Sequence, residues 1–307
     1  MGRSLGFVRG VPPSKIDARR DPRRRTRRVI PLGVAFVLAA CSHSQKEPTE
    51  PKGSTAAASR AAGARGAYQG KSVPQPSGAE PQRPERDPQA IAALERMGAY
   101  LRTLTRFGVR GETATDEVLL NGQKIQFEKT IDLKVQRPNK FRIDVRSDRQ
   151  ERQLFYDGKT LTVYGEKVGY YAQAEAPPTI NETLQEAQNR FGIATPLADL
   201  FYWGAAPTDE ESLIGAIDVG PSRVRGVDTE QYAFQLSDVD FQLWIEKGDK
   251  PLPRKFIITT KTEPSQPQYT VNLAWDLAPR FDDGVFAFSP PPGAKRVFFQ
   301  EQAAPSP

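Results

Sequence analysis

An alternation of apolar and polar residues limits the fold of this chain more than any other feature. It is clearest over residues 124–136, where the apolar side chains are Ile125, Phe127, Ile131, Leu133 and Val135. The same period of two returns over residues 141–146 and 269–275. This period belongs to β-strands with one covered face and one wet face, and such strands pair antiparallel. The sequence therefore predicts an antiparallel sheet with one apolar face.

Two helical segments interrupt the strands. Asp87 and Pro88 fit an N-cap and a first helical position, and apolar residues follow at helical spacing, so residues 88–104 are predicted to form a leading helix. In mid-chain, Thr179 and Glu182 have the spacing of a capping box, and Thr195 opens a second short helix. The predicted fold class is mainly β, with a leading helix and a mid-chain helical insertion.

Turn residues separate the strands. Asn121-Gly122, Asp157-Gly158 and Gly248-Asp249 are plausible hairpin turns. Strands are expected to run to Phe288, because the three prolines from Pro290 end the regular structure. Four arginines between the first strands have acidic neighbours and are assigned to a wet face of the sheet: Arg142, Arg146, Arg149 and Arg152.

Residues 1–40 have the pattern of a secretory signal peptide: a basic region, an apolar run from Val29 and small residues before the expected cleavage site. The run of about a dozen residues is too short to cross a bilayer as a helix, which needs about 20 residues. Residues 1–30 carry ten basic and two acidic side chains, whereas the whole chain has a net charge of only +6. The mature chain is therefore slightly acidic, and nucleic acid is not an expected partner.

The segment Leu38-Ala39-Ala40-Cys41 resembles a lipobox, the processing site of bacterial lipoproteins. This resemblance implies that Cys41 is acylated and becomes the anchored N-terminus, and several acyl chains together give stable anchoring. Ser42 after the cysteine implies the outer membrane under the enterobacterial sorting pattern. The alternatives are a buried cysteine or an uncleaved anchor, a start downstream of Met1, and a twin-arginine export signal.

A disordered tether is predicted over residues 41–86. Pro, Gly, Ala, Ser and Gln dominate it, and Tyr68 and Val73 are its large apolar exceptions. Such a segment cannot bury enough surface to offset the entropy of ordering. As a flexible coil it spans roughly 35–40 Å root-mean-square. We predict a folded domain over residues 87–298 and a flexible tail over residues 299–307.

Over residues 88–298 the chain resembles an uncharacterised family of predicted periplasmic proteins with the LolA-like fold. The residues that carry the resemblance are Leu154-Phe155-Tyr156-Asp157-Gly158-Lys159-Thr160-Leu161, Tyr170-Tyr171, Pro196-Leu197-Ala198-Asp199-Leu200, Leu243-Trp244-Ile245-Glu246 and Leu252-Pro253-Arg254-Lys255-Phe256. This fold is shared by the lipoprotein carrier LolA, the receptor LolB, the mycobacterial lipid-binding lipoprotein LppX and the stress regulator RseB. The family itself has no assigned activity.

The resemblance implies a single strongly curved, unclosed sheet, a half-barrel with helices on its concave side. In relatives the space between sheet and helices is apolar and holds acyl chains, and hiding hydrocarbon there contributes about 0.8 kcal/mol per methylene. The candidate residues for binding a hydrophobic ligand are Phe127, Tyr156, Leu184, Leu197, Phe201, Trp203, Trp244 and Trp275. Each of them also fits an ordinary core position.

Most catalytic sites need residue types that the predicted domain lacks. His43 and Cys41 are the sole histidine and cysteine, and both precede the domain, which excludes a Ser-His-Asp site and a His/Cys zinc site within it. Phosphate-loop motifs are also missing. Carboxylate chemistry at Asp238 and Asp240, or at Asp282 and Asp283, remains open, although both pairs fit polar turns. We therefore predict a protein that is not an enzyme and uses no metal or cofactor.

The sequence thus predicts a periplasmic protein, lipid-anchored to the outer membrane, that binds an acyl chain or a lipoprotein's lipid between sheet and helices. A role in lipid or lipoprotein trafficking would follow. The alternative is an RseB-like sensor or scaffold whose partner is another envelope protein. The sequence leaves open whether the space between sheet and helices is empty.

Overall fold

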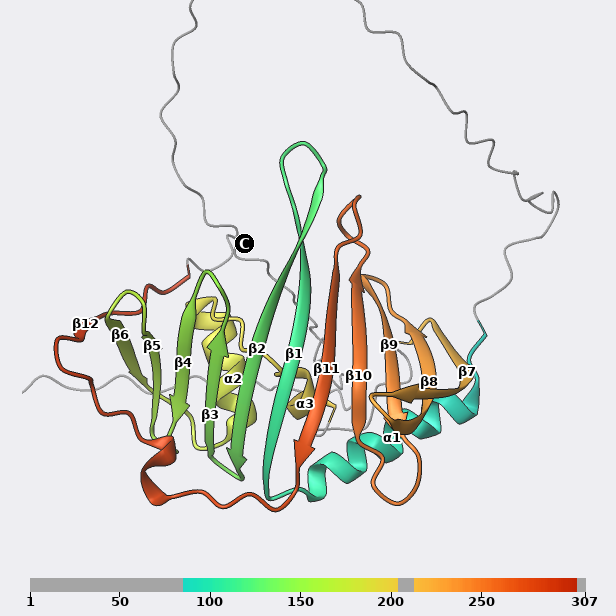
Figure 1. The fold of residues 1–307 in the computed structure, drawn as a ribbon, viewed down its shortest axis with the longest axis horizontal. Helices are drawn as coiled ribbons and strands as arrows, with labels where there is room; N and C mark the ends of the chain where they lie inside the picture. The colour runs from blue at the N-terminus through green and yellow to red at the C-terminus, as the bar shows by residue number, and fades with distance from the viewer. Residues whose placement is uncertain (1–84, 204–212, 303–307) are drawn as a thin grey trace, which may run out of the picture. The chain divides into compact units, whose positions relative to one another are not determined.

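The structure is a computed structural model that describes residues 85–203 and 213–302 (Figure 1). The predicted signal peptide, Cys41 and most of the predicted tether lie outside these residues. Among the helices that are described, none is long and apolar enough to cross a membrane.

Twelve strands of the described chain form one sheet, in the order β12-β6-β5-β4-β3-β2-β1-β11-β10-β9-β8-β7. The strands before the helical insertion are β1 (Arg106–Val118), β2 (Lys124–Gln136), β3 (Lys140–Arg146), β4 (Glu151–Tyr156), β5 (Thr160–Gly165) and β6 (Tyr170–Glu175). The strands after it are β7 (Gly215–Val224), β8 (Val227–Gln235), β9 (Val239–Glu246), β10 (Pro253–Thr260), β11 (Gln268–Asp276) and β12 (Lys295–Val297). Neighbours pair antiparallel, except that β12 runs parallel to β6. The predicted single, curved and unclosed antiparallel sheet is confirmed.

The helices begin where the capping residues predict. The Asp87 side chain accepts a hydrogen bond from the Gln89 backbone N–H at 2.7 Å and opens α1 (Pro88–Thr103). The Thr179 side chain accepts one from the Glu182 N–H and opens α2 (Ile180–Phe191), and Gly192 ends this helix in the left-handed conformation. A single-turn helix, α3 (Asp199–Tyr202), follows. The leading helix and the helical insertion are therefore both present.

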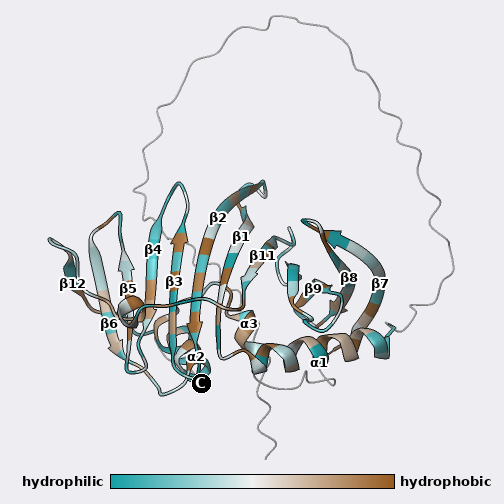
Figure 2. Cartoon of the chain, turned by 60° about the horizontal axis from the view of Figure 1, so that its bottom comes forward, coloured by the Kyte–Doolittle hydropathy of each residue, from teal (hydrophilic) through white to brown (hydrophobic). Residues whose placement is uncertain are grey.

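All three helices lie along one side of the sheet (Figure 2), which we call the inner face. The strand register fixes which residues share it: Val109 on β1 faces Leu133 on β2 and Trp275 on β11. These side chains join the helices in one contiguous hydrophobic core. Its largest fully buried members are Tyr156, Phe107, Phe141, Phe201 and Phe256. The opposite side of the sheet is the outer face.

The C-terminal segment runs along one edge of the sheet, past the lower ends of the strands in Figure 1, from β11 through the short helix η2 (Asp283–Phe286) to β12. Phe288 packs on the outer face against Phe155, Tyr164 and Tyr171, with ring centroids 5.1–5.4 Å apart. The sequence predicts a flexible tail from residue 299, yet Phe299 stacks on Phe191 of α2 at 4.8 Å. The C-terminal segment therefore covers part of the outer face and then contacts the helical insertion.

Helix α1 approaches the end of α3 at Gly98. A Cβ atom placed on Gly98 would collide with the backbone carbonyl oxygen of Trp203. Helix propensity alone favours Gly98→Ala by about 1 kcal/mol. Because the carbonyl is backbone and cannot turn aside, we expect the substitution to destabilise the domain instead, by about 1–3 kcal/mol in urea unfolding.

The matched control is Ala99→Gly on the exposed side of the same turn, which should lose about 1 kcal/mol through propensity alone. If Gly98→Ala raised the free energy of unfolding, the close approach of α1 to Trp203 would be wrong.

Candidate functional site

The inner face beneath the helical insertion gathers most of the predicted ligand-binding residues. After Gly192 ends α2, the chain turns at Leu197, whose φ is 61°. The Leu197 side chain then lies over Gly111 of β1, where a Cβ atom would stand 3.4 Å from Leu197 Cδ1. Gly111 thus leaves room in the sheet for the inserted segment to pack closely.

Aromatic rings connect α3 to the strands beneath it. The ring centroid of Phe107 on β1 lies 6.5 Å from that of Phe201 and 5.6 Å from that of Trp275. Trp275 Nε1 donates a hydrogen bond to the Pro253 carbonyl oxygen at 2.8 Å. Trp203 meets Phe256 edge-on at 5.3 Å. These contacts hold α3 on the inner face.

The buried part of this site is packed. Tyr156, Leu184, Leu197 and Phe201 are each at most 2% exposed and belong to the contiguous core. Tyr156 also donates a hydrogen bond from its hydroxyl to the Pro177 carbonyl oxygen. Between the sheet and the insertion, the described side chains are in contact with one another, so a ligand that enters must displace some of them.

Two other predicted residues lie elsewhere. Phe127 is half-buried on the inner side of β2, away from the aromatic rings of α3, and the Arg149 guanidinium lies 3.8 Å above its ring. Trp244 is on the outer face, because it pairs with Lys255 on β10, whose Nζ lies 4.5 Å from the Trp244 ring. Residues on the outer face cannot line a space beneath the helices, so Trp244 leaves the candidate set.

Three cations on the inner side of the sheet were not among the predicted site residues. Arg152 of β4 faces Val145, so it shares the inner face with Leu154, and the assignment of Arg152 to a wet face is wrong. Lys129 of β2 lies on the same face as Ile131. Arg137 follows β2, and its guanidinium lies 5.5 Å from the Phe201 ring centroid.

These cations are poorly compensated. Within the part of the chain that the structure describes, the buried Nε atoms of Arg137 and Arg152 have no hydrogen-bond partner. Arg152 Nη2 donates to the Ala194 carbonyl oxygen at 3.3 Å. Burial lowers the pKa of Lys129, and the nearby Arg152 charge lowers it further, against a smaller opposing effect of Glu117. The inner face thus holds positive charge with little to balance it.

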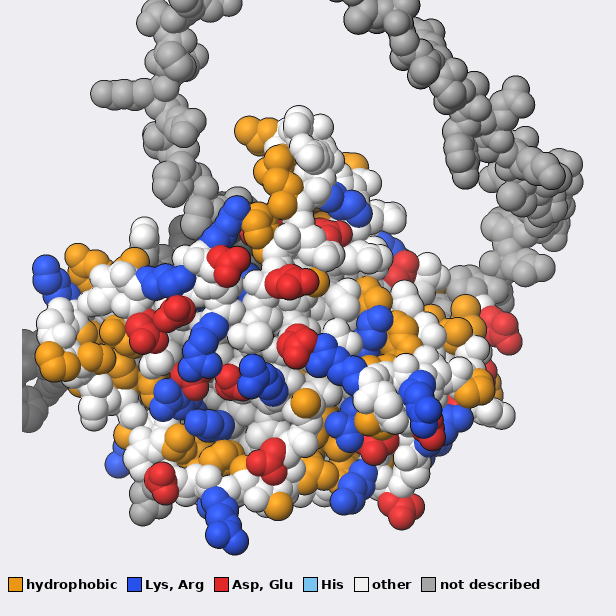
Figure 3. Space-filling view, in the orientation of Figure 1, with side chains coloured by type: hydrophobic (Ala, Val, Ile, Leu, Met, Phe, Trp, Pro, Cys, Tyr) orange, Lys and Arg blue, Asp and Glu red, His pale blue; other side chains and the backbone are white. Residues whose placement is uncertain are grey.

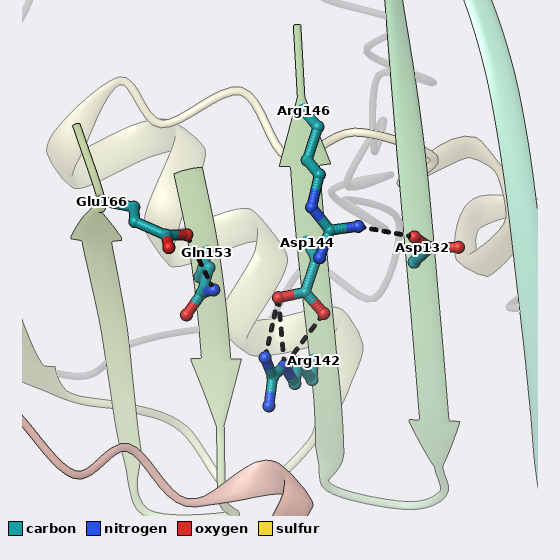
Figure 4. Close-up of polar contacts among 6 residues, drawn as sticks. All are labelled: Asp132, Arg142, Asp144, Arg146, Gln153 and Glu166. Carbon is teal, nitrogen blue, oxygen red and sulfur yellow. Dashed lines mark hydrogen bonds and ion pairs between the residues drawn. The ribbon is translucent and has the colours of Figure 1, made fainter. Parts of the chain in front are cut away.

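On the outer face, by contrast, basic side chains are paired with acidic ones. Arg142 pairs with Asp144 at 2.9 Å, and Arg146 pairs with Asp132 at 3.1 Å (Figure 4). Basic and acidic side chains alternate across this face of the molecule (Figure 3). The Arg146–Asp132 pair is exposed and contributes little to stability, whereas Asp144 is buried beside Arg142. Neither pair leaves an unbalanced charge. For Arg142 and Arg146 the predicted wet face is confirmed.

An open groove of about 1100 Å³ lies at the base of the β1–β2 hairpin. Of the three inner cations described above, Lys129 is the one that lines it, and Glu112, Glu128 and Arg146 line it from the outer face. Thr113, Phe127, Lys129, Arg149 and Glu117 are among its lining residues. Thr113 Oγ1 donates a hydrogen bond to the Lys129 carbonyl oxygen at 3.3 Å. Lys129 therefore lies at the boundary between the packed core and solvent.

The carboxylates that could support catalysis do not converge. Asp240 of β9 accepts a hydrogen bond from Lys261 Nζ at 3.0 Å, and Asp282 precedes η2 as its N-cap. No group of three or more His, Cys, Asp or Glu side chains within residues 85–203 and 213–302 could hold a metal ion. The described residues thus offer no assembled acid–base or metal site.

A family match covers most of the chain. A family model described as predicted periplasmic protein (DUF2092) matches residues 90–300. The chain belongs to this family. No curated protein matches the sequence.

Solved structures with a related fold include three named proteins. The Mycobacterium tuberculosis lipoprotein LppX is 10% identical, with 64% of this chain and 100% of LppX covered and a TM-score of 0.39. A LolA superfamily protein from Nitrosomonas europaea is 11% identical, with coverage of 65% and 97% and a TM-score of 0.32. MucB in complex with MucA(peri) is 19% identical, with coverage of 62% and 57% and a TM-score of 0.34. At these values the similarity carries no information on a ligand.

Asp199, at the start of α3, is the acidic side chain most affected by burial in this site. Burial raises its pKa from 3.8 to about 6. The folded protein therefore holds a proton that the unfolded chain has lost between about pH 4 and pH 6, so stability falls as the pH rises through this window. We expect Asp199→Asn to remove this fall and to stabilise the domain at pH 7.5 by about 1–3 kcal/mol.

The measurement is urea unfolding of both proteins at pH 4.5 and pH 7.5. Equal pH dependence of the two proteins, or a less stable Asn variant at pH 7.5, would mean that a partner stabilises the ionised carboxylate.

Proposed function

We propose that this protein is a non-enzymatic, lipid-anchored protein of the cell envelope that binds a hydrophobic ligand between its curved sheet and its helical insertion. Cys41 would carry the anchor, in the outer membrane, and the segment up to residue 86 would act as the tether. The domain would hide an acyl chain or a lipoprotein's lipid from water, in lipid or lipoprotein trafficking.

One observation carries this proposal: the inserted segment covers the apolar inner face of the sheet with apolar side chains of its own. Leu184, Leu197 and Phe201 all come from this segment, and all are buried against the inner face. The helix α2 within it has its own caps at Thr179 and Gly192, and on ligand binding the insertion would shift while the sheet stays paired. The apolar area beneath it would then be offered to hydrocarbon, which replaces the same contacts.

Native mass spectrometry with organic extraction tests the proposal on residues 42–307, which lack the anchor cysteine but contain the whole described core. A lipid bound at a defined stoichiometry, or taken up when lipids are offered, would support it. A ligand-free mass that stays unchanged in the presence of lipids would overturn it.

A charge within the cover should prevent ligand binding. In Leu184→Asp the buried carboxylate must reach water, so we expect retained lipid to fall at least about tenfold, the factor that corresponds to 1.4 kcal/mol. The control is Leu120→Asp at the fully exposed tip of the β1–β2 hairpin, where retention should be unchanged. Circular dichroism of both variants separates loss of ligand from loss of fold.

A second candidate function rests on the edge strand β7. Ile217 and Val219 on this strand are about half exposed. Beyond Ala216, to which Arg86 already bridges, the strand edge can accept a strand from another protein. In that case the protein would act as a sensor or scaffold for an envelope protein. Crosslinking in the envelope should then be lost in Ile217→Lys and Val219→Lys, whereas Leu184→Asp should leave it intact.

A further inference from the structure

We infer that Lys129 and Arg152 form a subsite for an oxyanion head group, so that the ligand is an anionic amphiphile with a phosphate or carboxylate head. This inference rests on the proposed function and deepens it. It assigns the polar end of the ligand to two residues of the inner face and leaves the acyl chain to the apolar residues beside them.

The strand register brings the two cations together. Arg152 on β4 faces Val145 on β3, and Val145 in turn faces Ile131 on β2. Lys129 is two residues from Ile131 along β2, so it projects from the same face of the sheet. Both side chains therefore project from the same face of the sheet, from the strands on either side of β3, and the charge of Arg152 lowers the pKa of Lys129.

Burial makes this pair unusual. The Nε atom of Arg152 is buried without a hydrogen-bond partner, and neither Arg152 nor Lys129 forms a salt bridge with any described carboxylate. Both side chains are half-buried, and two like charges in such a place repel, while each has lost part of its hydration. An anion between them would supply the missing acceptor and the missing charge, and an arginine suits a planar or tetrahedral oxyanion.

The surroundings of Arg137 make it a less suitable anion ligand than Lys129 and Arg152. The Arg137 guanidinium already lies over the Phe201 ring, a contact that partly compensates its charge. Lys129 instead lines the open groove, where Arg149 adds a positive charge and Glu117 and Glu128 add negative ones. A head group can therefore approach Lys129 from solvent, and the apolar side chains of Ile131 and Leu133 continue along β2 toward the core.

The arrangement fixes the orientation of the ligand. Along the inner side of β2, the residues change from Phe127 and Lys129 near the groove to Ile131, Leu133 and Val135 within the core. A ligand with its anion at Lys129 would direct its chain toward these apolar residues and under the helical insertion. A neutral lipid of the same length would gain the apolar contacts alone.

The test compares dodecyl phosphate, dodecanol and inorganic phosphate on residues 42–307, by titration calorimetry and native mass spectrometry. We expect dodecyl phosphate to bind at least about tenfold more tightly than dodecanol, which corresponds to one gained ion pair. Equal affinity of these two ligands would overturn the inference and leave the proposed function intact. If neither dodecyl phosphate nor dodecanol bound, both the inference and the proposed function would be wrong. Tight binding of inorganic phosphate alone would support the anion site and overturn the hydrophobic ligand.

Two substitutions locate the effect. Lys129→Met and Arg152→Met remove one charge each while keeping a long apolar stem, and each should reduce the preference for dodecyl phosphate over dodecanol to within about threefold, since one ion pair is lost. The control is Lys134→Met on the outer face of β2, which should keep the wild-type preference.

A purely structural role gives a different pattern. If Arg152 served only to hold the Ala194 carbonyl, Arg152→Met would weaken dodecyl phosphate and dodecanol by the same factor, and the inference would be wrong. Arg152→Met also removes a poorly compensated charge, so we expect its urea-unfolding midpoint to rise. A cooperative unfolding transition would show that the variant folds.

Discussion

The apolar inner face of the sheet has to be removed from water, and the rest of the domain is arranged around that requirement. Curvature alone does not cover this face, because β12 and β7 remain at opposite ends of the strand order. The helices supply the second layer and share one contiguous core with the sheet. Since the mid-chain insertion is part of that layer, stability and access to the inner face depend on the same contacts.

Residue parity along each strand predicts which face most side chains occupy. Ile131, Leu133 and Val135 lie on the inner face as the alternation indicates. The same parity places Arg152 with Leu154 and Tyr156, and the error at Arg152 came from giving its charge more weight than its position. Trp244 shows the converse error, because its size suggested a cavity while its alternation with Leu243 and Ile245 put it outside. Both positions could have been found from the sequence.

Other features depend on contacts between distant segments, which periodicity does not encode. β12 spans three residues after a run of prolines, and it pairs with β6, the strand whose Tyr171 contacts Phe288 on the outer face. The poor compensation of Lys129 and Arg152 likewise depends on which carboxylates the folded sheet brings near, and local sequence cannot supply that. The acidic neighbours Asp144 and Glu151 suggested balanced charge, yet Asp144 points to the other face.

The entry of the chain into the domain has a mechanical consequence. Arg86 forms an isolated bridge to Ala216 on the edge strand β7, through hydrogen bonds from the Asp87 N–H to the Ala216 carbonyl and from the Ala216 N–H to the Glu85 carbonyl. A pull transmitted along the chain from residues before Glu85 would load these two bonds first. The edge strand β7 would therefore take up such a pull before the buried face of α1 does.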